Sequence, residues 1–243
     1  MPAIALCVAL VALAPAVATA KPKRGIDVSR FQGEIDWARV GATNVEFAWA
    51  QASRGEGADC AVVPDRCGPD EFYADNYQGA TDAGIRVGAY HRAFAGGGGK
   101  KATKRDARRE AKVFIDQVGE LRDRDLLPAL DIETPFGGLS AKGLRRWIRV
   151  WLDRVRRKLG AKPIVYTNLS SWQATGDTRR FARDGHPLWV ANFGVDSPAV
   201  PAGNWDGRGW SVWQYTSSGK VSGIKGSVDR NRLRVGWRKV SVR

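Results

Sequence analysis

The chain has 243 residues, of which 43% are hydrophobic and 26% are charged. This length and composition exclude a disordered chain and suit one large domain or two small ones, a single α/β barrel among them. The net charge of +14 and the isoelectric point near 10.1 favour an anionic partner or surface, although a solvated basic surface explains much of this charge without any function.

The first twenty residues, MPAIALCVALVALAPAVATA, are apolar and end in the small-x-small pattern Ala18-Thr19-Ala20. They predict a secretory signal peptide over residues 1–20, although no lysine or arginine lies near its start. The alternative is an uncleaved membrane anchor, but the run barely reaches spanning length and Pro15 interrupts it. We therefore expect a secreted protein, extracellular or associated with the cell wall, with no stable membrane span after cleavage.

Eight short runs with the composition of β-strands follow along the chain. They cover residues 24–29, 45–53, 85–94, 126–134, 162–168, 187–193, 209–216 and 226–233. Helical patterns lie between several of these runs, but from about residue 185 onward the strands follow one another without full helices between them. This order predicts one α/β domain over residues 21–243, a TIM-like barrel whose last helices are missing or reduced.

Two of the helical patterns are long and amphipathic. Residues 103–120 place a row of apolar side chains on one face: Ala107, Ala111, Phe114, Ile115 and Val118. Residues 140–159 begin at an N-cap, Ser140, and end at Gly160, with a longer apolar row: Leu144, Trp147, Ile148, Trp151, Leu152, Val155 and Leu159. The opposite face of this second helix is strongly basic, so a helix lying on a membrane surface is the alternative to an outer helix of a barrel.

Cysteine and histidine are rare in the chain. Cys60 and Cys67 lie close together in the loop-like stretch GADCAVVPDRCGPD, and such a pair in an exported protein predicts a local disulfide. Cys7 would leave with the signal peptide. Two cysteines and the distant His91 and His186 do not make a zinc site, and no serine or cysteine nucleophile motif accompanies them. We therefore predict no metal and no cofactor.

Four acidic residues lie at predicted strand ends: Asp27, Asp131, Glu133 and Asp229. Asp131 and Glu133, one residue apart in LDIET, share a strand face, and taken alone they could equally be solvated at a strand end. The other two come from opposite ends of the chain and can share a site only if the first and last strands are neighbours in a closed barrel. Paired carboxylates are typical of glycoside hydrolysis, and repulsion within such a cluster raises one pKa so that this residue can donate a proton.

Aromatic side chains accompany these acids. Several of the ten tryptophans lie near predicted strand ends, namely Trp189, Trp210 and Trp213. Flat apolar rings can stack on pyranose rings, but a single tryptophan is more often a packing residue. His91 follows Tyr90 on a strand and should face the other way, so we expect packing or a structural hydrogen bond from it.

Six motifs occur in order along the chain: GIDVSRFQGEIDW, GAYHRAF, LPALDIE, PIVYTNLSSW, LWVANF and WSVWQYTSSGKVSGIKGSVDRN. In this order, from Gly25 to about Leu233, they resemble glycoside hydrolase family 25, the Chalaropsis-type lysozymes. The resemblance implies that residues 21–243 form a catalytic domain with a (β/α)5(β)3 barrel. It also implies a muramidase that hydrolyses the β-1,4 bond between N-acetylmuramic acid and N-acetylglucosamine in bacterial peptidoglycan. With the predicted signal peptide, we expect this muramidase to be secreted.

The resemblance assigns roles to particular residues. Glu133 matches the general acid/base of the family, and Asp131 matches a partner that orients or polarises the 2-acetamido group of the substrate. Asp27 and Asp229 match the remaining acids of the cleft. The resemblance also implies that Tyr90, Tyr166, Trp213 and Gln214 bind substrate. Trp189 is added to these expected substrate-binding residues because it lies near a predicted strand end.

The chain departs from the family after its second strand, where Lys-Ala-Thr-Glu-Gly is often found and Gln51-Ala52-Ser53-Arg54-Gly55 stands here. The altered charges at positions 51 and 54 motivate one alternative, a cell-wall binding protein that kept the barrel but lost turnover. A second alternative is a hydrolase of another N-acetylhexosamine polymer such as chitin. The expected partners are peptidoglycan and anionic cell-wall polymers, with no specific nucleic acid, and we expect a monomer.

Overall fold

The structure is a computed structural model, and it describes residues 21–55 and 67–243. The predicted signal peptide over residues 1–20 lies outside the described residues. So does Cys60, one half of the predicted Cys60–Cys67 disulfide. Cleavage after Ala20 and this pairing therefore stay predictions.

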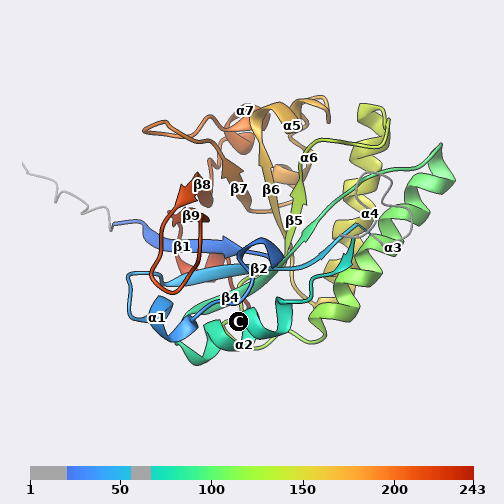
Figure 1. Cartoon of the computed structure of the whole chain (residues 1–243). Coiled ribbons are helices and arrows are strands. Elements are labelled where there is room, and N and C mark those ends of the chain that lie inside the picture. Colours follow the sequence, from blue (N-terminus) through green and yellow to red (C-terminus); the bar gives the residue numbers. More distant parts are fainter. Residues whose placement is uncertain (1–20, 56–66) are drawn as a thin grey trace, which may run out of the picture.

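A nine-stranded sheet contains a closed barrel of eight strands (Figure 1). The barrel strands are β1 (Lys23–Val28), β2 (Phe47–Arg54), β4 (Arg86–Arg92), β5 (Ala129–Ile132), β6 (Ile164–Asn168), β7 (Leu188–Ala191), β8 (Val212–Gly219) and β9 (Val228–Leu233), and β3 (Gly68–Pro69) extends the edge of β2. β1 pairs in parallel with β2 and antiparallel with β9, so the first and last strands close the barrel. All eight predicted strands are confirmed.

The helices on the outside of the barrel are α1 (Trp37–Gly41), α2 (Tyr73–Asp82), α3 (Lys100–Val118), α4 (Ala141–Leu159), α5 (Leu169–Gln173), α6 (Arg180–Arg183) and α7 (Pro201–Asp206). Among the helices of residues 21–55 and 67–243, only α3 and α4 reach 19 residues. The connections after β6 carry short helices, and β8 leads directly into β9. The predicted (β/α)5(β)3 barrel with reduced last helices is therefore confirmed. In the described part of the chain, no helix combines the length and the apolarity needed to cross a bilayer.

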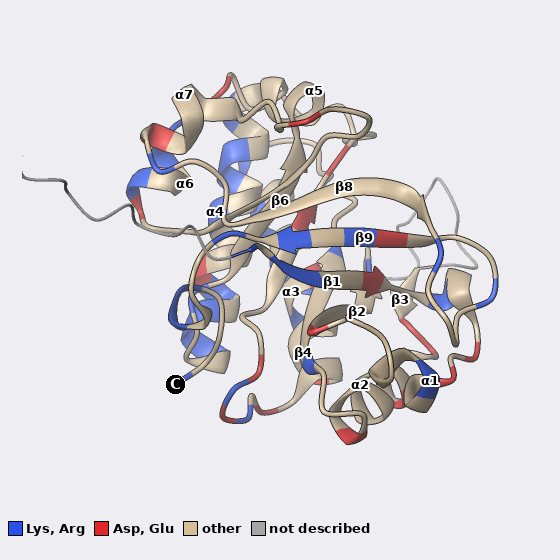
Figure 2. Cartoon of the chain, turned by 90° about the vertical axis from the view of Figure 1, so that its left-hand side faces the viewer, with Lys and Arg blue, Asp and Glu red and all other residues tan. Residues whose placement is uncertain are grey.

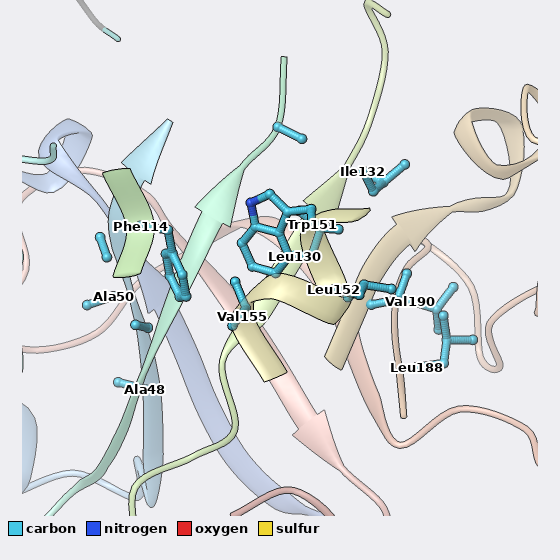
Figure 3. Close-up of a cluster of buried hydrophobic side chains, with 14 of the residues drawn as sticks. Ala48, Ala50, Phe114, Leu130, Ile132, Trp151, Leu152, Val155, Leu188 and Val190 are labelled. Atoms are coloured by element: carbon cyan, nitrogen blue, oxygen red, sulfur yellow. The ribbon is translucent and has the colours of Figure 1, made fainter. Parts of the chain in front are cut away.

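α4 begins and ends as its sequence predicts. The Ser140 hydroxyl accepts a hydrogen bond from the Gly143 backbone N–H at 3.2 Å, and Gly160 ends the helix in the left-handed conformation with φ 71°. The apolar rows of α3 and α4 pack against outward-facing side chains of β2, β5 and β7 (Figure 3). Because the barrel covers the apolar face of α4, that face is not open to a membrane, and the alternative of a membrane-surface helix is wrong.

Bulky apolar side chains fill the lower part of the barrel interior. Trp49 of β2 and Trp189 of β7 lie with ring centroids 4.8 Å apart, and both are buried. Gly88 of β4 permits this packing, because a Cβ there would lie 2.6 Å from Leu126 Cβ and 2.8 Å from Trp49 Nε1. The tightly packed floor excludes water from beneath the barrel mouth.

His91 lies on the outer face of the sheet, as predicted from its place beside Tyr90. Its Nδ1 is 2.8 Å from Ser53 Oγ, its Nε2 is 2.8 Å from Glu110 Oε2, and its ring stacks on Trp151. These three polar side chains have the order of a hydrolase triad, but all are buried between the barrel wall and the helices that cover it, so substrate cannot reach them. Burial, with the nearby Arg92 charge, lowers the pKa of His91 to about 3.

The buried His91 makes folding stability depend on pH. The native imidazole stays neutral down to about pH 3, whereas the unfolded chain takes up a proton near pH 6.5. Between these values the unfolded state binds more protons, so the free energy of unfolding falls as the pH falls, by at most about 1.4 kcal/mol per pH unit. Urea unfolding at pH 7 and pH 4.5 measures this loss. We expect a smaller loss for His91→Gln, which does not titrate, and an unchanged loss would contradict a neutral buried His91.

Candidate active site

A layer of polar side chains lies above the apolar floor, at the mouth formed by the C-terminal ends of the parallel strands. Asp27, Asp131 and Asp229 line one cavity there of about 190 Å³. Asp229 is near the start of β9, not at the end of a strand as predicted, and it reaches the same mouth because β9 runs antiparallel. Figure 2 shows the acidic ends of β1 and β9 side by side. Glu133 follows β5 directly at this mouth.

Asp27 and Asp229 form a carboxyl pair across the seam between β1 and β9. They are direct partners in the strand register, and a hydrogen bond joins their side chains. Burial, followed by the charge of Asp229, raises the pKa of Asp27 well above its usual range, and burial also raises the pKa of Asp229. The pKa of both carboxyl groups is therefore raised, which favours one proton shared within the pair.

Two amide side chains hold Asp27 in place. Asn231 Nδ2 donates to Asp27 Oδ2 at 2.7 Å, and Gln214 Nε2 lies 3.0 Å from the same oxygen. Trp189 Nε1 donates to Asn231 Oδ1 at 2.8 Å, and the Tyr166 hydroxyl donates to Gln214 Oε1 at 2.9 Å. One hydrogen-bonded chain therefore links strands β1, β6, β7, β8 and β9.

Arg92, at the end of β4, lies between the two acids of LDIET. Its Nε is 3.5 Å from Asp131 Oδ2 and 3.8 Å from Glu133 Oε2. The guanidinium also donates to the backbone carbonyl oxygens of Ala93, Glu133 and Thr134 at 2.9–3.1 Å, which fixes its position. The shared arginine confirms that Asp131 and Glu133 face the same way.

Asp131 and Glu133 lie in different surroundings. Burial raises the pKa of Asp131 well above its usual range, the Arg92 charge opposes this rise, and the Glu133 charge adds to it. The Glu133 side chain is 28% exposed, and its Oε1 accepts a hydrogen bond from Asn168 Nδ2 at 3.2 Å, with the Tyr166 hydroxyl 3.3 Å away. Asp131 is thus enclosed, whereas Glu133 is open to the cleft.

Glu133 also lines a second cavity of about 440 Å³, together with residues after β6 and β7. Asn168, Leu169 and Phe193 are among its lining side chains, and Phe193 is 46% exposed. The smaller cavity, on the Asp131 side, is lined in part by the exposed ring of Phe31. Arg92 lines the smaller cavity and its Nε lies 3.8 Å from Oε2 of Glu133, which lines the larger one, so the two cavities are neighbours.

The altered residues at positions 51 and 54 both line the smaller cavity. Gln51 is buried, and its Nε2 lies 3.4 Å from the Tyr90 hydroxyl. The Arg54 guanidinium lies 5.2 Å from the centre of the Phe94 ring. Burial and the nearby acids raise the pKa of Tyr90 well above its usual range, so this phenol stays protonated.

The structure corrects the expected positions of two tryptophans. Trp189 is 1% exposed and lies inside the barrel beneath Tyr166, so its ring does not reach the cleft. Trp213 is also buried and packs on the outside of the barrel, because its neighbour Gln214 faces inward and adjacent strand residues face opposite ways. The exposed rings beside the acids are Phe31 and Phe193, which the sequence did not single out. Arg92, Asn168 and Asn231 were also missed, although each lies in or beside a family motif.

Clustered carboxylates at the mouth of an α/β barrel are the machinery of barrel-type glycoside hydrolases. Within residues 21–55 and 67–243, no three histidine, cysteine or acidic side chains come together in an arrangement that could hold a metal ion.

Comparison with known proteins identifies the family. The profile of "Glycosyl hydrolases family 25" matches residues 26–224. The chain is 36% identical to "Lysozyme M1" of Streptomyces globisporus, over 86% of the chain and 67% of that protein. It is 28% identical to the "N,O-diacetylmuramidase" of Chalaropsis sp., over 85% of the chain and 95% of that protein. The crystal structure of the bacterial lysozyme from Streptomyces coelicolor superimposes with a TM-score of 0.74 at 34% identity, covering 87% of this chain and 92% of that one.

The chain therefore belongs to glycosyl hydrolases family 25 and is a glycoside hydrolase. The resemblance inferred from the six motifs is confirmed.

The protonation of Asp27 can be tested by substitution. In Asp27→Asn, the amide oxygen can accept from Asn231 and Gln214 while the amide nitrogen donates to Asp229, which reproduces the bonds of a protonated carboxyl group. We expect the free energy of unfolding to change by less than about 1 kcal/mol. In Asp27→Ala, two buried amides lose their acceptor, which costs about 2–4 kcal/mol. Urea unfolding at pH 6 compares the two variants, and equal losses would mean that Asp27 is ionised.

Proposed function

We propose that the chain is a lysozyme that hydrolyses the β-1,4 bond between N-acetylmuramic acid and N-acetylglucosamine in bacterial peptidoglycan. The lysozyme and muramidase names of the related proteins support this substrate. The observation that carries the proposal is the position of Glu133, which lines the larger cavity and lies 3.8 Å from Arg92 of the neighbouring smaller one. A glycan chain bound across both cavities would have its scissile bond beside this carboxyl group.

In this proposal Glu133 is the general acid that protonates the leaving glycosidic oxygen. Its exposure to the cleft supports this role, because a proton donor must reach the substrate. The Asn168 amide and the Tyr166 hydroxyl near Oε1 hold the carboxyl group in one orientation. In a two-step reaction the same group then serves as the base that activates water in the second step, whereas in a direct displacement a second carboxylate of the cluster activates the water.

Asp131 orients the 2-acetamido group of the substrate in this proposal. Asp131 lines the smaller cavity, where its carboxylate can accept a hydrogen bond from the N–H of an acetamido group. Arg92 opposes the effect of burial and favours the ionised form of Asp131. Asp27 and Asp229 complete the acid cluster, and the Gln214 and Asn231 amides position Asp27.

The substrate-binding surface in this proposal includes Tyr90 and the rings of Phe31 and Phe193, which line the two cavities. Tyr166 and Gln214 are buried beside it and contact Glu133 and Asp27. Stacking of sugar rings on the exposed phenylalanines would orient the chain along the cleft. Trp189 supports Tyr166 and Asn231 from below without touching substrate.

We also propose that residues 1–20 direct export and that residues 21–243 are the mature catalytic domain. A substrate that lies outside the cytoplasmic membrane supports this arrangement. The lysozyme names of relatives that cover most of the domain support action at the cell wall.

Loss of turbidity of a purified peptidoglycan suspension tests the catalytic role of Glu133. Glu133→Gln keeps the size of the side chain but cannot donate the proton, so we expect at least about a 100-fold lower rate. Glu120→Gln is the matched control, because Glu120 is exposed beyond α3 and lines neither cavity, and its rate should equal that of the wild type. If the wild type were as inert as Glu133→Gln, the chain would be a wall-binding protein without turnover.

The new reducing ends identify the bond that is cleaved. We expect N-acetylmuramic acid at every new reducing end, because the proposed cleavage leaves the glycosidic carbon on that sugar. New N-acetylglucosamine ends, or faster release of sugar from chitin than from peptidoglycan, would contradict the proposed substrate.

The pH profile of kcat/KM tests the contribution of Arg92. Removal of its charge in Arg92→Gln raises the pKa of Asp131 further, because the Arg92 charge is the larger of the two arginine effects that oppose burial. If Asp131 must be ionised, the acidic limb of the profile shifts to higher pH, by about one unit. Arg54→Gln is the matched control and should shift the limb less, since Arg54 has the smaller effect on the same carboxyl group. A limb that does not move would exclude a role for ionised Asp131.

A further inference from the structure

A basic groove lies on the outer wall of the barrel between α4 and the segment that contains α6. Its volume is about 640 Å³. α4 contributes Lys142, Arg145, Arg146 and Arg149, and the facing segment contributes Arg179, Arg180 and Arg183. The remaining lining residues are Thr178 and Asp184, and none of the nine lines a cavity of the mouth. Figure 2 shows the basic bands of α4 and α6 on a different side of the barrel from the acidic ends of β1 and β9.

Few carboxylates neutralise this groove. Arg180 Nε lies 3.6 Å from Asp184 Oδ2, and Arg183 Nε lies 3.2 Å from Asp206 Oδ1. In the described ranges, no carboxylate oxygen comes within 4.0 Å of the side-chain nitrogens of the other five basic residues. Several positive charges therefore add along one groove, where a concave wall concentrates their field.

The cationic side chains are held by the fold. Arg145, Arg146 and Arg149 are half-buried on a helix whose apolar face is fixed in the core. Arg145 Nη1 donates to the Thr175 backbone carbonyl oxygen, which ties α4 to the facing segment. Arg179 lies over α7, where a Cβ on Gly203 would be 2.5 Å from its Cζ. Ordered arginines lose less conformational entropy on binding than free ones do.

The chemistry of the lining identifies the class of ligand. Guanidinium groups bind phosphate oxygens in a bidentate manner, and six of the seven basic residues are arginines. No aromatic residue lines the groove, so the stacking that holds the bases of single-stranded nucleic acid is missing. No large apolar side chain lines it either, in contrast to surfaces that insert into membranes. Neighbouring positions on one helix face lie about 5–6 Å apart, which suits successive charges of a flexible polymer.

We propose that the basic groove binds a phosphodiester polymer of the bacterial cell wall. This proposal rests on the proposed function in one respect, namely that the substrate lies in a wall that carries such polymers. The groove is on the side of the barrel, so a bound polymer leaves the mouth open. Two weak attachments to the same wall, one at the groove and one at the cleft, raise the local concentration of substrate at the cleft.

Neutralisation of three cations of the groove tests this proposal. The variant Lys142→Gln/Arg146→Gln/Arg149→Gln removes three cations of α4 and keeps the helix propensity and Arg145. Its control, Arg156→Gln/Arg157→Gln/Lys158→Gln, removes three exposed cations from the same helix outside the groove. The measured quantity is the dissociation constant for soluble wall phosphodiester polymer at about 50 mM salt. We expect the groove variant to bind about 10-fold or more weakly and the control variant to bind within about 2-fold of the wild type.

Cosedimentation with intact walls, and with the same walls freed of phosphodiester polymer, shows whether the groove acts at the wall. We expect the groove variant to lose binding to intact walls only. Thermal unfolding and hydrolysis of polymer-free peptidoglycan should be unchanged in both variants, which shows that they are folded. These two readouts also separate the proposals, because failure of hydrolysis by the wild type concerns the lysozyme function and not the binding of polymer.

Three results would overturn the groove proposal. Equal losses in the two triple variants would show that diffuse charge, not this groove, attracts the polymer. Unchanged binding of the groove variant would exclude the groove directly. Single-stranded DNA and phosphatidylglycerol vesicles are compared with wall polymer at equal phosphate concentration. If either bound more tightly than the wall polymer, and if the groove variant lost more of this binding than the control variant, the groove would be assigned to nucleic acid or to lipid.

Discussion

The hydrogen bonds that the Asn231 and Gln214 amides donate to Asp27 join the two ends of the fold. Asp27 belongs to β1, the first strand, and the amides belong to β9 and β8, the last two. A buried carboxyl group without donors would destabilise the closed barrel, and the amides without their acceptor would do the same. The position of every other acid depends on this closure, because only a closed barrel brings Asp229 beside Asp27 and both of them to the mouth that holds Asp131 and Glu133.

The interior of the barrel is divided into an apolar layer and a polar layer, and the carboxyl pair between β1 and β9 lies in the polar layer. The floor formed by Trp49, Trp189 and their neighbours is dry and closely packed, whereas the layer above consists of acids, amides and tyrosines. Trp189 joins the two layers, since its ring belongs to the floor and its Nε1 donates to Asn231. The low polarity beneath the acids raises the pKa values of Asp27 and Asp131, and Arg92 limits this effect for Asp131 alone. One cluster thus contains carboxyl groups with different affinities for protons, the condition that acid and base chemistry requires.

Much of the fold could be predicted from the sequence, because local patterns determine it. The eight strands follow from alternating and apolar runs, and α4 follows from the Ser140 cap, the Gly160 terminator and the apolar row between them. The site is harder to predict from the sequence, because its contacts join residues that are far apart in the chain. Arg92 gives no sign in the sequence that it lies between Asp131 and Glu133. Adjacent strand residues face opposite ways, so the inward position of Gln214 implies an outward Trp213, although tryptophan content alone suggested a place in the cleft. The basic groove depends on α4 and α6 lying side by side, which neither segment reveals alone.

Because the first and last strands pair to close the barrel, the barrel can close only after its last strand has been made. During synthesis or export from the N-terminus, Asp27, Asp131 and Glu133 emerge well before Asp229, which lies close to the C-terminal end of the barrel. A partly emerged chain would have neither the carboxyl pair nor the amides that hold Asp27. Catalytic competence would therefore be acquired in one late step, when β9 enters between β1 and β8, and a wall-degrading activity would be absent until the whole barrel is in place.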